Sequence, residues 1–393
     1  MAADDEMTIA ERRKYLMKQR TRYRQANRGE KSRLLTEMEA VTGLHRKSLV
    51  RLLNQLSLKR KRSIVRRGRT YGLDVEQVIT VVWESLDYLC AERLQPQLLR
   101  TAQHLARFDE VQLTPSCEAQ LTQISVATVH RLLRRHRRPP TRLPQKGPEA
   151  ANRLRQAVPM QRIPWDTTEP GHFEVDLVHH AGGTAAGEHG YTLQLIDVAT
   201  GWSERVALLG RSQRAMEGAF RHVLDRLPFP IQELHPDNGG EFFNAHLFRL
   251  IDELLPGVRL SRSRPYHKND NRFVEQKNAT LVRAYLGHQR LETPEQIAAL
   301  NTLYDQMWGY YNLFQPVLRL KEKPIIDGTV RRVWDNAQTP YQRLLSRDVL
   351  TADQHHGLAE QYATTNPRRL RREIDAQLID LWTSCQPERL AAD

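Results

Sequence analysis

The sequence predicts a multidomain protein with all-α units at the N-terminus, an α/β core in the middle and a mainly helical C-terminal region. Positive charge is concentrated in the first third, strand-like alternation of apolar and polar residues begins near residue 172, and helical periodicity returns beyond residue 321. The chain has 393 residues, of which 40% are hydrophobic and 27% charged. That length and composition suffice for several domains with their own cores.

Charge divides the chain into two unequal parts. Residues 1–150 contain 30 Lys and Arg against 16 Asp and Glu, a balance of +14. The remaining 243 residues contain 29 against 30, a balance of −1. A basic region joined to a near-neutral one indicates a module that binds a polyanion. On charge alone, DNA binding and a plain solvated basic face both remain open.

Simple counts exclude several classes of protein. No run approaches 18 apolar residues, so we expect no membrane span and no membrane partner. Residues 1–7 are acidic and lack an apolar stretch, so we expect no secretory signal. The three cysteines, Cys90, Cys117 and Cys385, lie far apart. This argues against a disulfide framework or a zinc ribbon and fits a reducing cytoplasm.

We expect residues 1–58 to form a helix-turn-helix domain. Apolar residues at helical spacing predict a helix over residues 33–40, and residues 45–56 resume the pattern after a turn that contains Gly43. The second helix carries polar side chains that we expect to contact DNA, namely Arg46, Lys47, Ser48 and Arg51. The alternative is a plain helical hairpin of a bundle.

A basic linker and a second helical unit follow. Residues 59–73 form an expected linker with seven Lys or Arg among residues 59–69. We expect Arg60, Arg66 and Arg67 to lie on DNA phosphates, although such a run can also be a solvated surface. A second helical DNA-binding unit is expected over residues 74–138, and Ser125 caps its last helix. The exposed positions of that helix carry Thr128, Arg131, Arg134 and Arg135.

Residues 164–320 are expected to form an α/β core after a Pro-rich linker over residues 139–163. Periodicity predicts three strands, a helix, a strand, a helix, a strand and a helix. The strands cover residues 172–179, 191–198, 203–209, 231–235 and 258–263, and the helices cover residues 212–227, 245–255 and 270–287. This is the order of an RNase H-like domain, in which three antiparallel strands are extended by parallel ones through helical crossovers.

Three carboxylates occupy informative places in this order. Asp176 lies on the first strand, Asp237 directly follows the fourth, and Glu275 lies in the first turns of the last helix. Magnesium prefers such hard oxygen ligands, and two ions can serve both oxygens of an in-line phosphoryl displacement. We expect these residues to hold two Mg²⁺ ions, which Mn²⁺ can replace. Singly, each acid would be an ordinary surface or turn residue.

Other polar residues of the core are interpreted differently. Asp197 is expected to support the fold by hydrogen bonding. Several histidines could suggest zinc, but their spacing is not that of a ligand set. No Lys-Ser/Thr pair follows Gly187, so we expect no nucleotide cofactor. Basic residues beside Glu275 are expected to face DNA, namely Lys268, Arg272 and Lys277.

Three blocks of this core resemble the DDE transposase and retroviral-type integrase superfamily. They are residues 170–176, 235–242 (HPDNGGEF) and 269–276 (NDNRFVEQ), and the helix-turn-helix region resembles bacterial insertion-sequence transposases. One departure is the Asn269-Asp270-Asn271-Arg272 segment, where the superfamily usually has Asn-Gly. The resemblance implies catalysis by Asp176, Asp237 and Glu275.

The implied reaction is the cutting and joining of double-stranded DNA. The protein would bind terminal repeats as a homo-oligomer in the bacterial nucleoid, nick the ends, and transfer the freed 3′-OH strand to target DNA. One alternative is a metal-dependent DNA nuclease without strand transfer. Another is a non-catalytic DNA-binding regulator derived from a transposase.

The tail, residues 321–393, is expected to be helical. Helical stretches are predicted at residues 339–345, 351–362 and 367–383. Asn366 is the expected N-cap of the last one, whose first turns are rich in arginine. This helix could bind DNA or a second subunit, and the sequence does not decide between them.

Overall fold

The structure, a computed structural model, describes residues 7–55, 70–136, 164, 166–184, 186–236, 245–261, 271–326 and 329–385. The chain divides into two compact units, Met1–Thr70 and Tyr71–Asp393. Below they are called unit 1 and unit 2, and each is described by itself. Within the described ranges, no helix combines the length and the apolar character needed to cross a membrane.

Unit 1 is a bundle of helices α1 (Ile9–Gln25), α2 (Arg28–Thr42) and α3 (Arg46–Asn54). The predicted helix pair is present, but α2 begins before residue 33. Asn27 and Glu30 form a capping box at that point, upstream of the apolar stripe on which the prediction rested. Gly43, with φ of 64°, ends α2 in the left-handed region. The core consists of leucines, one methionine and one tyrosine: Leu16, Tyr23, Leu34, Leu35, Met38, Leu49 and Leu53.

Unit 2 begins with a helical subdomain. Its elements are α4 (Leu73–Ser85), α5 (Ala91–Leu94), η1 (Gln95–Gln97), α6 (Leu98–Ala106), α7 (Pro115–Gln123) and α8 (Val126–Leu133). Its buried side chains belong to the same hydrophobic cluster as one face of the α/β sheet. Polar bonds also join the two parts, such as Gln97 Nε2 to Ala337 O at 2.7 Å and Tyr310 OH to Ser85 O at 2.7 Å. The second helical segment therefore packs as part of the core's unit.

The sheet of unit 2 has the strand order β3-β2-β1-β4-β5. The strands are β1 (His172–His180), β2 (Gly190–Asp197), β3 (Ser203–Leu209), β4 (Glu233–Pro236) and β5 (Arg259–Leu260). Strands β1, β2 and β3 pair antiparallel, whereas β4 pairs parallel to β1 and β5 parallel to β4. This confirms the predicted order and directions, with β5 shorter than expected.

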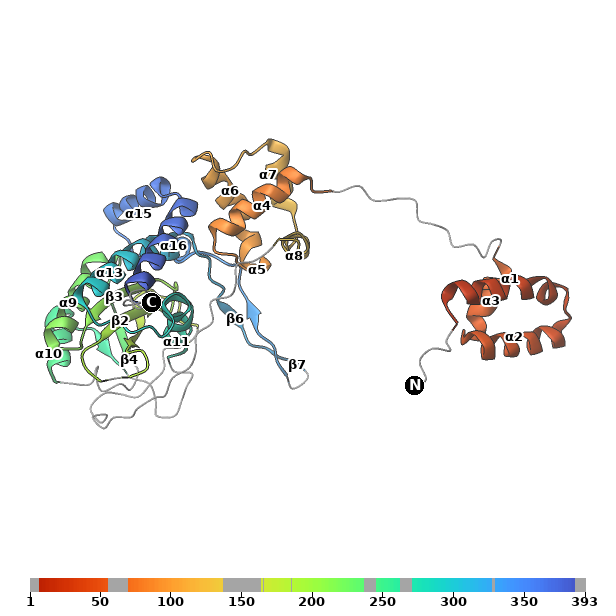
Figure 1. Cartoon of the computed structure of the whole chain (residues 1–393), viewed down its shortest axis with the longest axis horizontal. Helices are drawn as coiled ribbons and strands as arrows, with labels where there is room; N and C mark the ends of the chain where they lie inside the picture. The colour runs from red at the N-terminus through yellow and green to blue at the C-terminus, as the bar shows by residue number, and fades with distance from the viewer. Residues whose placement is uncertain are drawn as a thin grey trace, which may run out of the picture. The chain divides into compact units, whose positions relative to one another are not determined.

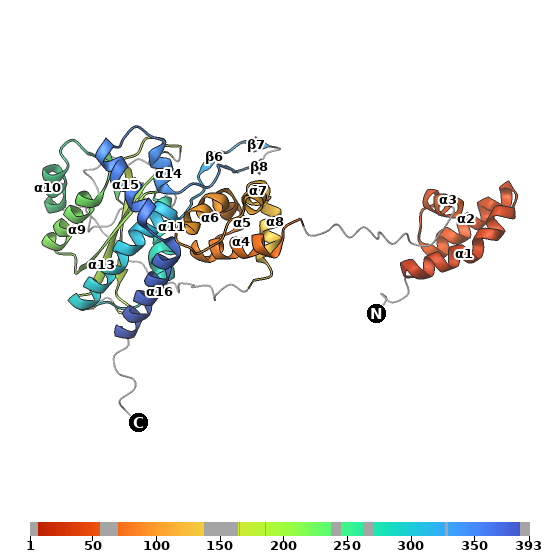
Figure 2. The same cartoon turned by 90° about the horizontal axis from the view of Figure 1, so that it is seen from above.

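Helices cover both faces of the sheet (Figures 1 and 2). They are α9 (Gln213–Arg226), α10 (Ala245–Leu254), α11 (Arg272–Lys277), the π-helical turn η2 (Asn278–Arg283), α12 (Ala284–Leu286), α13 (Pro294–Gly309) and the π-helical turn η3 (Tyr310–Phe314). Phe173 and Val175 pack with α9, whereas Val178 and Ala207 pack with α13. The helix predicted over residues 270–287 is therefore interrupted by a π turn, and such turns often mark functional sites.

The C-terminal part adds a β-ribbon and three helices. The ribbon strands are β6 (Leu320–Glu322), β7 (Ile325–Ile326), β8 (Thr329–Val330) and β9 (Val333–Trp334). The helices α14 (Pro340–Leu345), α15 (Ala352–Thr364) and α16 (Pro367–Ser384) lie close to the predicted positions. Asn366 caps α16 by accepting from Arg368 N and Arg369 N, as predicted. The ribbon was not predicted, because its strands are very short.

Candidate functional site

A buried carboxyl group joins strand β1 to helix α11. Glu174 Oε2 accepts hydrogen bonds from Phe273 N at 2.7 Å and Val274 N at 2.9 Å. Amides in the first turn of a helix have no partner within that helix. Glu174 therefore fixes the start of the helix that carries Glu275 against the strand that carries Asp176.

The environment of Glu174 shifts its acidity. Burial raises the pKa of Glu174 to about 8, against the lowering effect of the two amides and Arg272, and Glu275 adds to the rise. The contribution of Glu275 shows that its charge is felt at Glu174. The sequence analysis assigned no role to Glu174. The signal was its position two residues before Asp176 on the same strand.

Asp176 is half-buried in the middle of β1. Its Oδ1 accepts from Leu177 N at 2.8 Å, and its Oδ2 accepts from Asn278 Nδ2 at 2.5 Å. Asn278 begins the π turn and lies one helical turn after Glu275, which is exposed. Residues three apart share a helix face. Glu275 therefore lies on the side of the helix that faces Asp176.

The third acid follows a strand that is also next to Asp176. Strand β4 ends at Pro236, which pairs with Val175 of β1. Asp237 is the next residue and lies outside the described ranges. Among the described residues, no group of three or more His, Cys, Asp or Glu side chains could hold a metal ion. That finding leaves the triad untested, because Asp237 is not among those residues.

The described part of the site fits magnesium. Asp176 and Glu275 offer hard oxygen ligands that solvent can reach, and magnesium keeps several of its waters when bound. The Oδ1 atom of buried Asn278, beside Asp176, has no hydrogen-bond partner among the described atoms. A buried oxygen in that state indicates an absent water or ion. The donor set therefore suits a hydrated hard cation.

A buried polar row continues from Asp176 across the sheet. Asp176 pairs with Gln194 of β2, and Gln194 pairs with Arg205 of β3. Arg205 is 2% exposed, and its guanidinium lies 5.5 Å from the ring centre of Tyr304 and 5.1 Å from that of Tyr311. No described atom accepts a hydrogen bond from that guanidinium. The rings partly compensate its buried charge by cation–π contact.

Lys277 faces this row rather than open solvent. Burial lowers the pKa of Lys277 to about 7, and repulsion from Arg93 and Arg205 adds to the effect. Lys277 is half-buried, and Arg272 lies 4.6 Å from the ring centre of Phe273. A DNA contact by either residue stays a prediction. Lys268 lies outside the described residues.

The predicted DNA contacts of the helical segments differ in their surroundings. In α3, Lys47 and Arg51 are exposed, while Ser48 is half-buried. Arg46 is turned toward α2, where its Nη2 donates to Ser32 Oγ at 2.6 Å. These roles stay predictions, as do those of Arg60, Arg66 and Arg67, which lie outside the described residues.

Three arginines at the end of the second segment are exposed: Arg131 in α8, and Arg134 and Arg135 directly after this helix. Arg131 donates to Thr128 Oγ1 at 2.9 Å, and Arg135 lies 3.5 Å from Glu76. Both contacts lie at the surface and leave the guanidinium groups accessible. The structure thus places Arg131 in α8 and Arg134 and Arg135 in the turn that follows it, and the binding of these residues to DNA stays a prediction.

Other polar residues of the core support the fold. Asp197 is fully buried and accepts from Gly171 N at 2.9 Å and from Thr200 N at 2.7 Å, so its predicted structural role is confirmed. Burial raises the pKa of Asp197 against these hydrogen bonds. Three histidines bond to separate partners: His172 to Glu233, His180 to Thr192, and His235 to Ser261.

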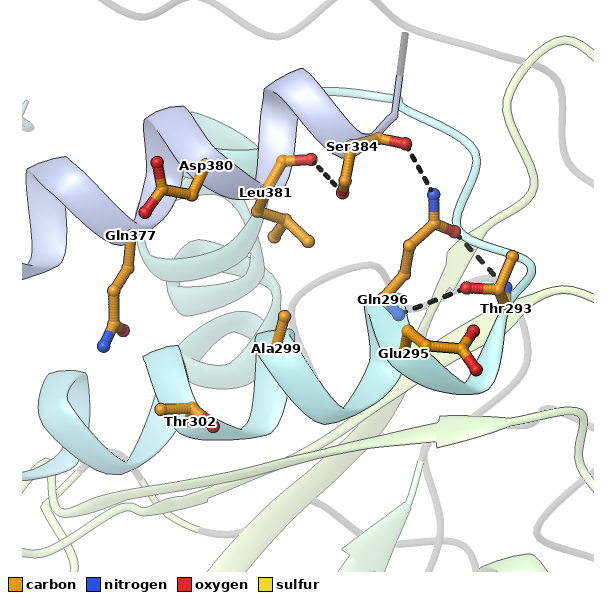
Figure 3. Close-up of a pocket in the computed structure, with 9 residues that line it drawn as sticks. All are labelled: Thr293, Glu295, Gln296, Ala299, Thr302, Gln377, Asp380, Leu381 and Ser384. Atoms are coloured by element: carbon orange, nitrogen blue, oxygen red, sulfur yellow. Dashed lines mark hydrogen bonds between the residues drawn. The ribbon is translucent and has the colours of Figure 1, made fainter. Parts of the chain in front are cut away.

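A pocket of about 560 Å³ lies away from the carboxylates, between α13 and α16 (Figure 3). Thr293, Gln296 and Ala299 line one side, and Gln377, Asp380 and Ser384 line the other. Gln296 Nε2 donates to Ser384 O at 3.3 Å across it. None of the predicted site residues lines this pocket, so we assign the chemistry to the carboxylates and not to the pocket.

Comparison with known proteins gives one extensive relative. No model of a protein family matches the chain. The chain is 34% identical over 323 residues to the uncharacterised protein y4rM of Sinorhizobium fredii, covering 82% of this chain and 91% of y4rM. The catalytic core domain of BIV integrase aligns with 17% identity and a TM-score of 0.28, over 45% of this chain and 94% of that domain. The strand order β3-β2-β1-β4-β5 and the strand directions of unit 2 are those predicted for an RNase H-like domain.

Proposed function

We propose that this chain, which belongs to the family of the uncharacterised protein y4rM, is a DNA transposase. The carboxylates of Asp176, Asp237 and Glu275 would catalyse the cutting and joining of DNA. One observation carries the proposal: strand β1, with Asp176, is bonded through Glu174 to helix α11, which carries Glu275, and through Asn278 to the π turn η2 that continues this helix. The three sequence blocks and the strand order support it.

The three carboxylates would hold two Mg²⁺ ions. When bound, such ions activate the attacking oxygen and stabilise the leaving oxygen of an in-line displacement at phosphorus. Asn278 holds one oxygen of Asp176 and so orients that carboxylate. Glu174 keeps α11, and with it Glu275, at a fixed place beside the sheet. Preorganisation of this kind lets water nick a strand and then lets the freed 3′-OH attack another strand.

The test is cleavage of a supercoiled plasmid that carries the genomic DNA flanking the gene. We expect nicking that requires Mg²⁺ or Mn²⁺ and disappears in Glu275→Gln protein. A matched control is Glu253→Gln on the exposed side of α10, which should nick like the wild type. Nicking that persists in Glu275→Gln protein or in EDTA would refute the catalytic assignment.

The same plasmid assay separates the alternatives. Nicked plasmid without joined product would favour a metal-dependent nuclease. DNA binding without nicking, at any divalent metal concentration, would favour the non-catalytic regulator. The acids of this chain argue against the second alternative, because a protein that only binds DNA has no need for Glu174 and Asn278 to fix them.

A further inference from the structure

The ribbon of unit 2, with described residues 320–326 and 329–334, carries apolar residues that no described part of the chain covers. Figure 1 shows it projecting from the body of the unit. Ile325 is 71% exposed, Val330 is 56% exposed and Trp334 is 51% exposed. Monomeric proteins seldom leave such side chains clustered in water without a partner.

Apolar side chains occupy both faces of the ribbon tip. Ile325 pairs with Val330 and Ile326 pairs with Thr329. Successive residues of a strand point to opposite faces, so Ile325 and Ile326 lie on opposite sides of the tip. A flat partner would cover only one of them. A groove, by contrast, contacts both faces of an inserted ribbon.

The base of the ribbon is fastened to the core of unit 2. Arg319 N donates to Asp335 Oδ1 at 2.8 Å, and Arg343 Nη1 donates to Asp335 Oδ2 at 2.7 Å. The guanidinium of Arg319 also donates to Val198 O, beside the sheet. A two-stranded ribbon is marginally stable on its own, so these bonds fix its direction. It is therefore a preorganised arm.

The charge on the ribbon is positive although unit 2 as a whole is neutral. Residues 320–334 contain four Lys or Arg and two Asp or Glu, which gives +2. Residues 71–393 contain 39 of each sign. Lys321, Arg331 and Arg332 are exposed, and the ion pair between Lys321 and Glu322, at 3.8 Å, is a weak surface pair.

We propose that the described ribbon is an arm that inserts into a groove of double-stranded DNA. The major groove is about 12 Å wide and admits a two-stranded ribbon. The apolar tip would contact base edges such as thymine methyl groups, and Lys321, Arg331 and Arg332 would contact the flanking phosphates. A second copy of the ribbon is disfavoured as occupant, because it would bring like charges together. This inference rests on the proposed function, which supplies the DNA.

The test uses full-length protein and a DNA duplex of about 40 base pairs, titrated at several salt concentrations. Arg331→Ala/Arg332→Ala should lower the slope of log affinity against log salt by about 2, near 0.9 for each lost phosphate contact. Ile325→Ser/Ile326→Ser should weaken binding several-fold and leave the slope unchanged. The matched control, Arg214→Ala/Arg221→Ala, removes the same charge from the exposed side of α9 and should leave both values unchanged.

Three results would overturn the assignment. If both ribbon variants bind DNA like the wild type, the ribbon does not insert into DNA, and the proposed transposase function is unaffected. If the α9 control lowers the slope equally, the ribbon contributes only general charge. If Ile325→Ser/Ile326→Ser dissociates an oligomer in sedimentation without changing DNA affinity, the ribbon docks on a second copy. Failure of the wild-type protein to bind any DNA would instead sink the proposed function itself.

Discussion

Unit 1 and unit 2 divide charge and carboxylate chemistry between them. Unit 1, residues 1–70, contains 20 Lys and Arg against 7 Asp and Glu, a balance of +13, whereas unit 2 contains 39 of each and is neutral. Unit 1 has a small core of three helices, and unit 2 has two large clusters on either side of its sheet. This difference implies that mutations in unit 1 can change the affinity for a polyanion without changing the carboxylate site of unit 2.

The largest expected effect is on the stability of unit 2. Glu174→Ala removes the acceptor of one buried and one partly buried amide, so we expect a loss of about 3 kcal/mol, since each unpaired buried group costs roughly 1–3 kcal/mol. Urea unfolding followed by circular dichroism measures this. Glu174→Gln keeps an acceptor and should lose less than half as much. Equal stability of the Glu174→Ala protein and the wild type would show that the hydrogen bonds from α11 to Glu174 do not stabilise unit 2.

The next effect is on activity without loss of binding. Asn278→Ala frees the Asp176 carboxylate, and loss of such a supporting hydrogen bond typically costs roughly 10–100-fold in metal affinity or activity. Nicking rates over a range of Mg²⁺ concentrations measure it, and DNA affinity should stay at the wild-type value. The control is Gln213→Ala, which removes an exposed amide side chain from α9 and should nick like the wild type. A wild-type rate in Asn278→Ala protein would show that the contact has no role.

A smaller effect belongs to unit 1. Lys47→Ala/Arg51→Ala removes two exposed charges from α3, and we expect roughly a tenfold loss of DNA affinity near 0.15 M salt, with a lower salt slope. Fluorescence anisotropy with a labelled duplex measures it. Arg12→Ala/Arg13→Ala on α1 removes the same charge as a control. If both pairs act equally, unit 1 binds by general charge, and the predicted recognition helix is wrong.

The smallest effect concerns acid stability of the sheet. Burial raises the pKa of Glu233, but hydrogen bonds from His172, Ser261 and Arg259 outweigh this effect and lower the pKa to about 2. A depressed carboxyl pKa stabilises the folded state above the ordinary value near 4.5, and that stability is lost as pH falls toward 2. Glu233→Gln should cost about 1 kcal/mol at pH 7 and less at pH 3 in urea unfolding. A cost that is constant with pH would refute the charge effect.

Much of the core could be predicted from the sequence, because strand alternation and helical periodicity directly reflect burial. The five strands, their directions and the role of Asp197 were found in this way. Glu174 and Asn278 were missed as supporting residues, since their function depends on contacts between β1 and α11 that no local pattern encodes. The ribbon was missed because strands of two or three residues have no measurable period.

The packing of the helical segment against the α/β core within unit 2 could not be predicted from the sequence either. The helical segment at residues 74–138 looked separate from the core, yet its apolar faces share one cluster with the sheet. Amphipathic periodicity shows that a helix buries one face but not what covers it. Long-range bonds such as Gln97 to Ala337 supply that information.

The most direct test of the account is strand transfer by the Asp176→Asn protein. A pre-nicked duplex from the flanking genomic DNA is incubated with a supercoiled target plasmid and Mg²⁺, and joined product is measured on a gel. The wild type and a surface control, Asp252→Asn, should give joined product, and Asp176→Asn should bind the duplex but give none. Joined product at the wild-type level from Asp176→Asn would contradict the account.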